Sequence, residues 1–134
     1  SYIYIDEEGI ILSILSGKKD EQVIEITGFE MDNPEIGKEI AFKNEKSKKN
    51  LLEFINYSKM LGLIDFFDAV NTDENGKLTI YMDTGAKVAF GALDDVKYKL
   101  NFLLSILEEL KSKNQGYQTI HLDKGNNAII IKDK

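Results

Sequence analysis

The side chains that most often carry catalysis or bind metals are scarce in this chain of 134 residues. It contains no cysteine, which excludes disulfides, thiolate metal sites and a cysteine nucleophile. Its one histidine, His121, excludes a centre with several histidine ligands, and a histidine-based triad can form only around that residue. Alternation along an expected strand puts His121 on the face opposite Ile120 and Leu122, towards solvent or a polar edge, where we expect no ligand role.

The segment Asp83-Thr84-Gly85 resembles the Asp-Thr-Gly loop of aspartic proteases, in which two such loops bring two carboxylates together to share a proton. A dimer could supply the second aspartate. Those enzymes also carry an apolar-apolar-Gly element downstream, and neither glycine beyond Gly91 follows two apolar residues here. We interpret the segment as a turn between two strands, since all three residue types are common in turns. A dimeric aspartic protease using Asp83 remains the alternative function.

Two further groups of carboxylates, Asp6-Glu7-Glu8 and Asp94-Asp95, are adjacent in sequence. A metal site or an acid/base pair needs carboxylates that converge from separate elements, whereas one group lies in an expected turn and the other starts an expected helix. We therefore predict no metal, no cofactor and no catalytic residue. The formal net charge of −6 argues against nucleic-acid binding. All 17 basic residues are lysines, so any charged contact with a partner must use lysine ammonium or carboxylate groups.

Hydrophobic patterning predicts eight strands and two helices in the order βββ-α-βββ-α-ββ. The strands are expected at Tyr2–Ile5, Ile10–Leu15, Val23–Thr27, Phe66–Thr72, Leu78–Met82, Ala86–Phe90, Gln118–Asp123 and Asn127–Lys132, and the helices at Glu45–Leu61 and Asp95–Asn114. Tight turns such as Asp6–Gly9 and Asn75-Gly76 join antiparallel neighbours. The pattern predicts one α+β domain over residues 1–134, with a mainly antiparallel sheet of about eight strands and the helices packed on it.

The final expected strand contains three consecutive isoleucines, Ile129, Ile130 and Ile131. They cannot all face one core, because neighbouring side chains alternate between the faces of a strand. Either both faces are covered within the domain, or one face is left for a partner. If this strand forms an edge of the sheet, its open N–H and C=O groups can accept a further strand.

Several short motifs recur in an order that resembles one known family. They are Ile5-Asp6-Glu7-Glu8-Gly9-Ile10, Ile26-Thr27-Gly28, Gly37, Leu78-Thr79-Ile80-Tyr81, Gly85-Ala86-Lys87-Val88-Ala89-Phe90-Gly91, Lys99-Leu100 and Ile120-His121-Leu122. Together they resemble the C-terminal extracytoplasmic domain of the bacterial cell-division proteins DivIB and FtsQ. The chain departs from the family pattern at two neighbouring positions. His121 stands where the family often has Asp, and Asp123 stands where the family often has a basic residue.

The resemblance implies a non-enzymatic scaffold of the division complex. Family members have a cytoplasmic tail, one membrane span and a small POTRA domain before this domain, and we expect those parts to be absent from this chain. The resemblance places the domain on the extracytoplasmic side of the cell membrane at the division septum. It implies two small coiled-coil membrane partners, one DivIC/FtsB-like and one FtsL-like, and no small-molecule substrate.

The same resemblance implies that partner contact involves the last strand and the turn before it. The matching positions are Asp123, Lys124, Gly125, Asn126, Asn127, Ala128, Ile129, Ile130 and Ile131. Contact by strand addition would use main-chain hydrogen bonds, and alternate side chains would supply specificity. An exported cell-wall or adhesion binding module is the other alternative.

Overall fold

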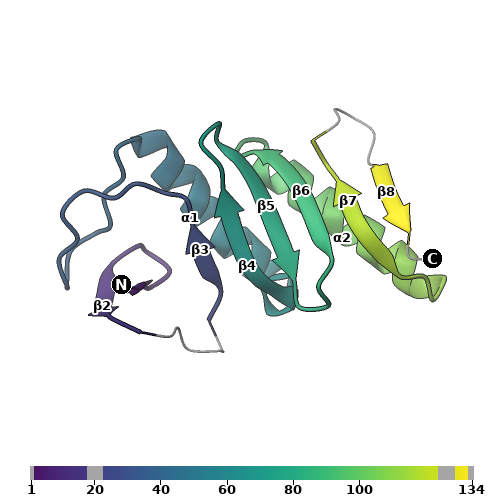
Figure 1. Ribbon diagram of the computed structural model, residues 1–134, viewed down its shortest axis with the longest axis horizontal. Coiled ribbons are helices and arrows are strands. Elements are labelled where there is room, and N and C mark those ends of the chain that lie inside the picture. The colour runs from purple at the N-terminus through teal and green to yellow at the C-terminus, as the bar shows by residue number, and fades with distance from the viewer. Residues whose placement is uncertain (1, 18–22, 124–128, 133–134) are drawn as a thin grey trace.

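The computed structural model describes residues 2–17, 23–123 and 129–132. These residues form eight strands, two α-helices and one 3-10 helix (Figure 1). In chain order they are β1 (Tyr2–Ile5), β2 (Ile11–Leu15), β3 (Glu25–Thr27), α1 (Glu45–Met60), η1 (Ile64–Phe66), β4 (Phe67–Thr72), β5 (Lys77–Met82), β6 (Lys87–Ala92), α2 (Val96–Ser112), β7 (Tyr117–His121) and β8 (Ile129–Lys132). The predicted α+β class and the predicted order of strands and helices are confirmed.

The strands form two sheets, and this corrects the expectation of a single sheet of about eight strands. Among the described strands, β1 and β2 pair only with each other, whereas the others form a six-stranded sheet in the order β3-β4-β5-β6-β7-β8. That sheet is mixed, because β3 pairs parallel with β4 and β6 pairs parallel with β7. Both parallel pairs flank a helix in sequence, and a helical crossover is the usual connection between parallel neighbours.

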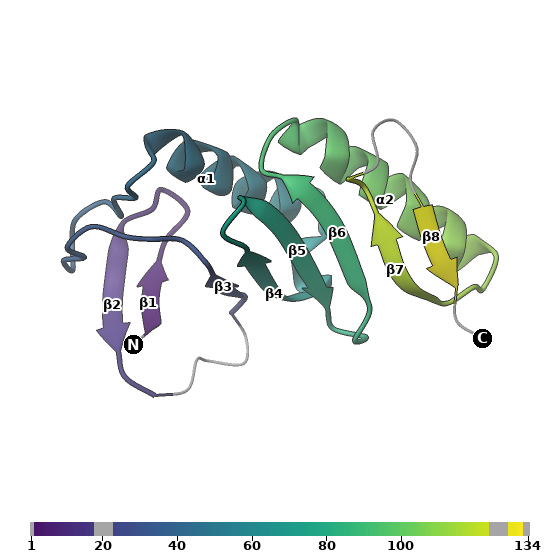
Figure 2. The same cartoon turned by 45° about the horizontal axis from the view of Figure 1, so that its top comes forward.

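Both helices cover the same face of the six-stranded sheet, as Figures 1 and 2 show. The core beneath them is built on one row of residues that is in register across all six strands. That row is Ile26, Val70, Ile80, Val88, Ile120 and Ile130. Phe54 of α1 is fully buried against the sheet and meets the Phe90 ring edge-on at 5.4 Å. The helices therefore hold the sheet through a continuous apolar layer.

No helix formed by the described residues lies on the other face of the sheet (Figures 1 and 2). Two rows of residues lie there, again in register across the six strands. They are Glu25, Ala69, Tyr81, Lys87, Thr119 and Ile131, and Thr27, Asn71, Thr79, Ala89, His121 and Ile129. We call this surface the open face.

The β1–β2 hairpin forms where the sequence predicts a turn at Asp6–Gly9. The Asp6 carboxylate accepts hydrogen bonds from the backbone N–H groups of Glu8 and Ile10, each at 2.9 Å, and Gly9 takes a φ of +82°. The hairpin packs on a second, smaller core of buried residues. They are Ile11, Ile40, Phe42 and Leu51. This second core, separate from the one under the large sheet, explains how the hairpin is held without joining that sheet.

Candidate functional site: the β8 edge and the open face

β8 is the last strand of the six-stranded sheet, so the segment chosen from the sequence lies at a sheet edge (Figure 1). β8 pairs antiparallel with β7, with Ile130 opposite Ile120. Ile130 packs against the core under the helices. Ile129 and Ile131 point to the open face, and each is 46% exposed. Of the two arrangements that the three isoleucines allowed, the structure has the one in which a single face is buried.

His121 and Asp123 adjoin this edge on the open face. Nδ1 of His121 lies 3.4 Å from Oδ1 of Asp123, without the geometry of a hydrogen bond. The two side chains form an ion pair only if the imidazole is protonated. His121 stands opposite Ile129 in the β7–β8 register. Ile120 and Leu122 are buried, so the predicted placement of His121 on the opposite face is confirmed.

Gly91 lets β6 approach the residue Asp123 that follows β7, and Lys99 ties the end of β6 to the start of α2. Sequence reasoning gave neither residue a part in the site. A Cβ on Gly91 would come 3.0 Å from Cβ of Asp123, so glycine allows the two backbones to lie close. The ammonium of Lys99 donates to the Ala92 carbonyl at 2.8 Å and to Asp94 Oδ1 at 3.0 Å. The same ammonium lies 4.9 Å from the centre of the Phe90 ring, a cation–π geometry. The motifs around Gly91 and Lys99 were the only sequence signal for this support.

The structure describes four of the nine residues predicted to contact a partner: Asp123, Ile129, Ile130 and Ile131. On the open face, Ile129 stands opposite His121, Ile131 stands opposite Thr119, and Asp123 lies beside His121. The other five predicted residues lie outside the described part of the chain. They are Lys124, Gly125, Asn126, Asn127 and Ala128.

The segment Asp83-Thr84-Gly85 forms the turn between β5 and β6, as predicted. The Gly85 N–H donates to the Met82 carbonyl at 3.0 Å, and the Asp83 N–H donates to the Phe66 carbonyl at 2.9 Å. Burial raises the pKa of Tyr117, the negative charge of Asp83 raises it further, and a hydrogen bond with Thr84 opposes the rise. The contacts of this turn are thus with its own sheet and with the start of β7.

No group of three or more His, Asp or Glu side chains within the described ranges could hold a metal ion. No helix formed by these residues is both long and apolar enough to cross a bilayer.

Within the described residues, these features define an α+β domain in which helices cover one face of the large sheet and the outer edge of β8 has no strand partner. A family model described as "Cell division protein FtsQ/DivIB, C-terminal" matches residues 1–123. The chain belongs to this family, and the resemblance noted from its motifs is confirmed.

Two relatives support the same assignment. "Cell division protein DivIB" from Clostridium botulinum strain Hall is 27% identical over 133 residues, which is 98% of this chain and 51% of the relative. The protein of the same name from strain Loch Maree gives the same identity and coverage. The chain thus spans about half the length of the curated relatives it matches. Membership of the family assigns the domain a role in bacterial cell division.

Proposed function

We propose that this domain is a non-enzymatic scaffold of the division complex that docks an extended segment of a small coiled-coil membrane partner along β8. The partners would be DivIC/FtsB-like and FtsL-like division proteins. The observation that carries the proposal is the position of β8 at the sheet edge, with Ile129 and Ile131 exposed on the open face. We also propose that the full-length protein crosses the cell membrane once and holds this domain on the extracytoplasmic side at the septum.

Docking would proceed by strand addition. A partner strand alongside β8 would exchange main-chain hydrogen bonds with its outer edge and continue the six-stranded sheet. Alternate side chains of the partner would lie on the open face, where Ile129 and Ile131 offer apolar contact. Asp123, with a side chain 23% exposed beside His121, would favour a basic partner group at that end of the strand.

The side-chain part of this proposal predicts the behaviour of a double variant, Ile129→Lys with Ile131→Lys. Both positions are exposed, so lysine remains solvated and the fold is retained, while the apolar contact with the partner is lost. We expect binding to the extracytoplasmic segment of a DivIC-like partner to weaken at least about tenfold, measured by calorimetry. The control is Leu12→Lys, because Leu12 is 57% exposed on β2, outside the large sheet. Equal affinities of the double variant and the control would contradict the proposal.

The main-chain part is tested by truncation after Gly125 and by Ile130→Pro. Each removes or interrupts the edge strand, and each is expected to abolish partner binding. Proline also removes a donor from the β7–β8 ladder, so the thermal unfolding midpoint must be measured alongside binding. A variant that stays folded and still binds with unchanged affinity would refute docking at β8.

A further inference from the structure

The turn between β4 and β5 contains Asn75-Gly76, and glycine follows no other asparagine in the sequence (Figure 1). Residues 73–77 are all exposed. Gly76 has a φ of +77°, and a Cβ built on it would meet nothing within 4 Å. An asparagine before glycine can lose its side-chain amide, because the backbone nitrogen of glycine reaches the asparagine Cγ without hindrance from a neighbouring side chain. Asn75 is therefore the asparagine of this chain with the least hindrance to this reaction.

The closed form of the turn is held by Asp73. Its carboxylate accepts from the N–H groups of Asn75 at 2.8 Å and Lys77 at 2.9 Å. Its carbonyl accepts from the Gly76 N–H at 3.0 Å, so the nitrogen that would attack is engaged as a donor. The reaction needs an opening in which these bonds break, and its rate therefore follows the population of the open turn.

We propose that Asn75 is a site of spontaneous deamidation, with water as the co-reactant, and that Asp73 sets its rate. The Gly76 nitrogen forms a bond to Cγ of Asn75, and the side-chain nitrogen leaves as ammonia with the proton that the Gly76 nitrogen loses. The resulting five-membered succinimide takes up water at either carbonyl carbon and opens to aspartate or isoaspartate. Either product adds a negative charge beside Asp73 and Glu74, and isoaspartate also adds a methylene group to the main chain between β4 and β5. The modification is therefore expected to loosen this hairpin, and it does not depend on the function proposed for β8.

The β1–β2 turn provides an internal comparison, because it repeats the same hydrogen bonds. The Asp6 carboxylate accepts from the N–H groups of Glu8 and Ile10, each at 2.9 Å. The Asp6 carbonyl accepts from the Gly9 N–H at 3.0 Å. Glu8 stands where the β4–β5 turn has Asn75, so the two turns differ at the reacting position.

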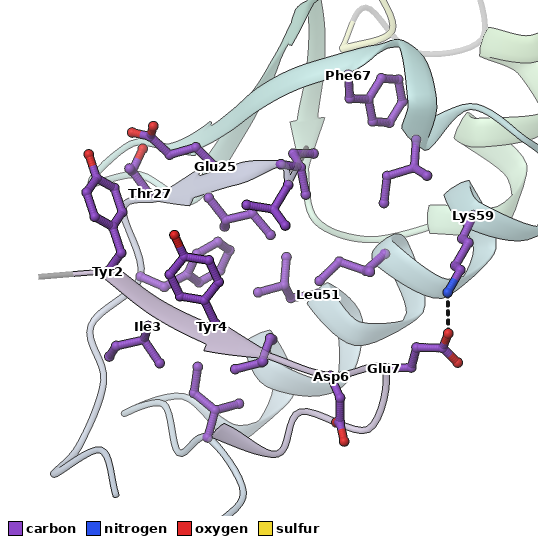
Figure 3. Close-up of a pocket in the computed structure, with 18 of the residues that line it drawn as sticks. Tyr2, Ile3, Tyr4, Asp6, Glu7, Glu25, Thr27, Leu51, Lys59 and Phe67 are labelled. Carbon is purple, nitrogen blue, oxygen red and sulfur yellow. Dashed lines mark hydrogen bonds and ion pairs between the residues drawn. The ribbon is translucent and has the colours of Figure 1, made fainter. Parts of the chain in front are cut away.

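The β1–β2 turn is also held from outside, by α1. The Asn56 amide donates to the Glu7 carbonyl at 3.0 Å, and the Lys59 ammonium pairs with the Glu7 carboxylate, as the dashed line in Figure 3 shows. A Cβ on Gly9 would lie 3.2 Å from Cδ1 of Leu52 in α1. Opening this turn must break these contacts too, so an asparagine placed in it should react more slowly than the one between β4 and β5.

The test incubates the 134-residue chain at mildly alkaline pH for several weeks and follows each asparagine by peptide mass spectrometry and an isoaspartate assay. We expect Asn75 to convert before any other asparagine, with release of ammonia. Asp73→Ala should speed the conversion roughly tenfold, because the turn loses both bonds to the carboxylate. The Gly76 amide should exchange with deuterium faster by the same factor, since both processes need the open turn. In Glu8→Asn, the new site should convert at least about tenfold more slowly than Asn75.

The matched control for Asp73→Ala is Glu74→Ala, which removes a carboxylate from the same turn but none of these acceptors. It should change the rate less than about twofold. Thermal unfolding midpoints show that each variant is folded before rates are compared. Four results would overturn the proposal: an Asn75 that stays intact, another asparagine that converts first, equal rates in Asp73→Ala and Glu74→Ala, and equal rates at the two turns of Glu8→Asn.

Discussion

At the scale of single residues, Gly28 is the glycine that leaves the least room for a side chain. It follows β3 with a φ of +97°, and a Cβ built on it would lie 1.9 Å from the Thr72 carbonyl oxygen. Gly76 has a similar φ of +77° in the turn between β4 and β5, but a Cβ there would meet nothing within 4 Å. An alanine at Gly76 would therefore measure the cost of a positive φ alone, whereas an alanine at Gly28 would add the cost of a steric clash.

We expect Gly76→Ala to lower the free energy of unfolding by about 1–2 kcal/mol, the cost of a left-handed conformation for a residue with a Cβ. Gly28→Ala should cost at least about 2 kcal/mol more, since the β3 end must also move away from Thr72. Urea unfolding of both variants measures the difference. Similar losses of unfolding free energy in the two variants would contradict the close approach of Gly28 to Thr72 of β4.

Tyr117 gives a prediction for the turn that carries Asp83. Burial and the Asp83 carboxylate raise the pKa of Tyr117 above its ordinary value of about 10. The neutral phenol is thus favoured in the folded state, and this contribution to stability is full below about pH 10 and is lost as the pH rises through the raised pKa.

We expect Asp83→Asn to lower the pKa of Tyr117 part of the way, because burial, the larger cause, remains. Titration of the Tyr117 ring signals by NMR measures the change, with Glu74→Gln as the control. A pKa that does not fall in Asp83→Asn would contradict the placement of this carboxylate beside Tyr117.

At the scale of elements, the start of α1 is fixed by its cap. Asn44 has an extended backbone, and its side-chain oxygen accepts from the N–H groups of Lys46 at 3.0 Å and Ser47 at 3.4 Å. We expect Asn44→Ala to cost about 1 kcal/mol in urea unfolding, while Asn44→Asp keeps the acceptor and costs little. If alanine and aspartate behaved alike, the cap would have no energetic role.

α2 begins one residue later than predicted, since the expected helix starts at Asp95 and α2 starts at Val96. Asp95 occupies the cap position with a φ of +44° and makes no side-chain capping bond. Asp94 binds the Lys99 ammonium at 3.0 Å. Hydrophobic patterning locates the helix, but the ion pair between Asp94 and Lys99 depends on how the chain turns before α2, which the pattern does not give.

The elements themselves were predictable because their signals are local. Alternating apolar residues mark β5, and the recurrent apolar stripe of Leu100, Leu103 and Leu110 marks α2. The pairing of β3 with β4 and of β6 with β7 was not predictable in the same way, since each joins strands separated by a helix. The same limit applies to the site: alternation suggested that one face of β8 could stay open, but the neighbours of Ile129 and Ile131 on β7 depend on register.

At the scale of the whole molecule, the large sheet ends in two different edges. β8 offers an edge with exposed isoleucines, and β3 forms the opposite edge, on the side of the β1–β2 hairpin (Figure 2). Between them, the helices cover one face and leave the other bare.

The most direct test of the central claim is hydrogen–deuterium exchange on the 134-residue chain with and without the extracytoplasmic segment of a DivIC-like partner. Strand addition predicts that the amides of Ile129–Lys132 exchange more slowly in the complex, because the outer N–H groups of β8 gain hydrogen-bond acceptors. The amides of β5, which is paired on both sides, should be unchanged. A partner that binds while the amides of β8 exchange at the same rate as in the free chain would contradict the account.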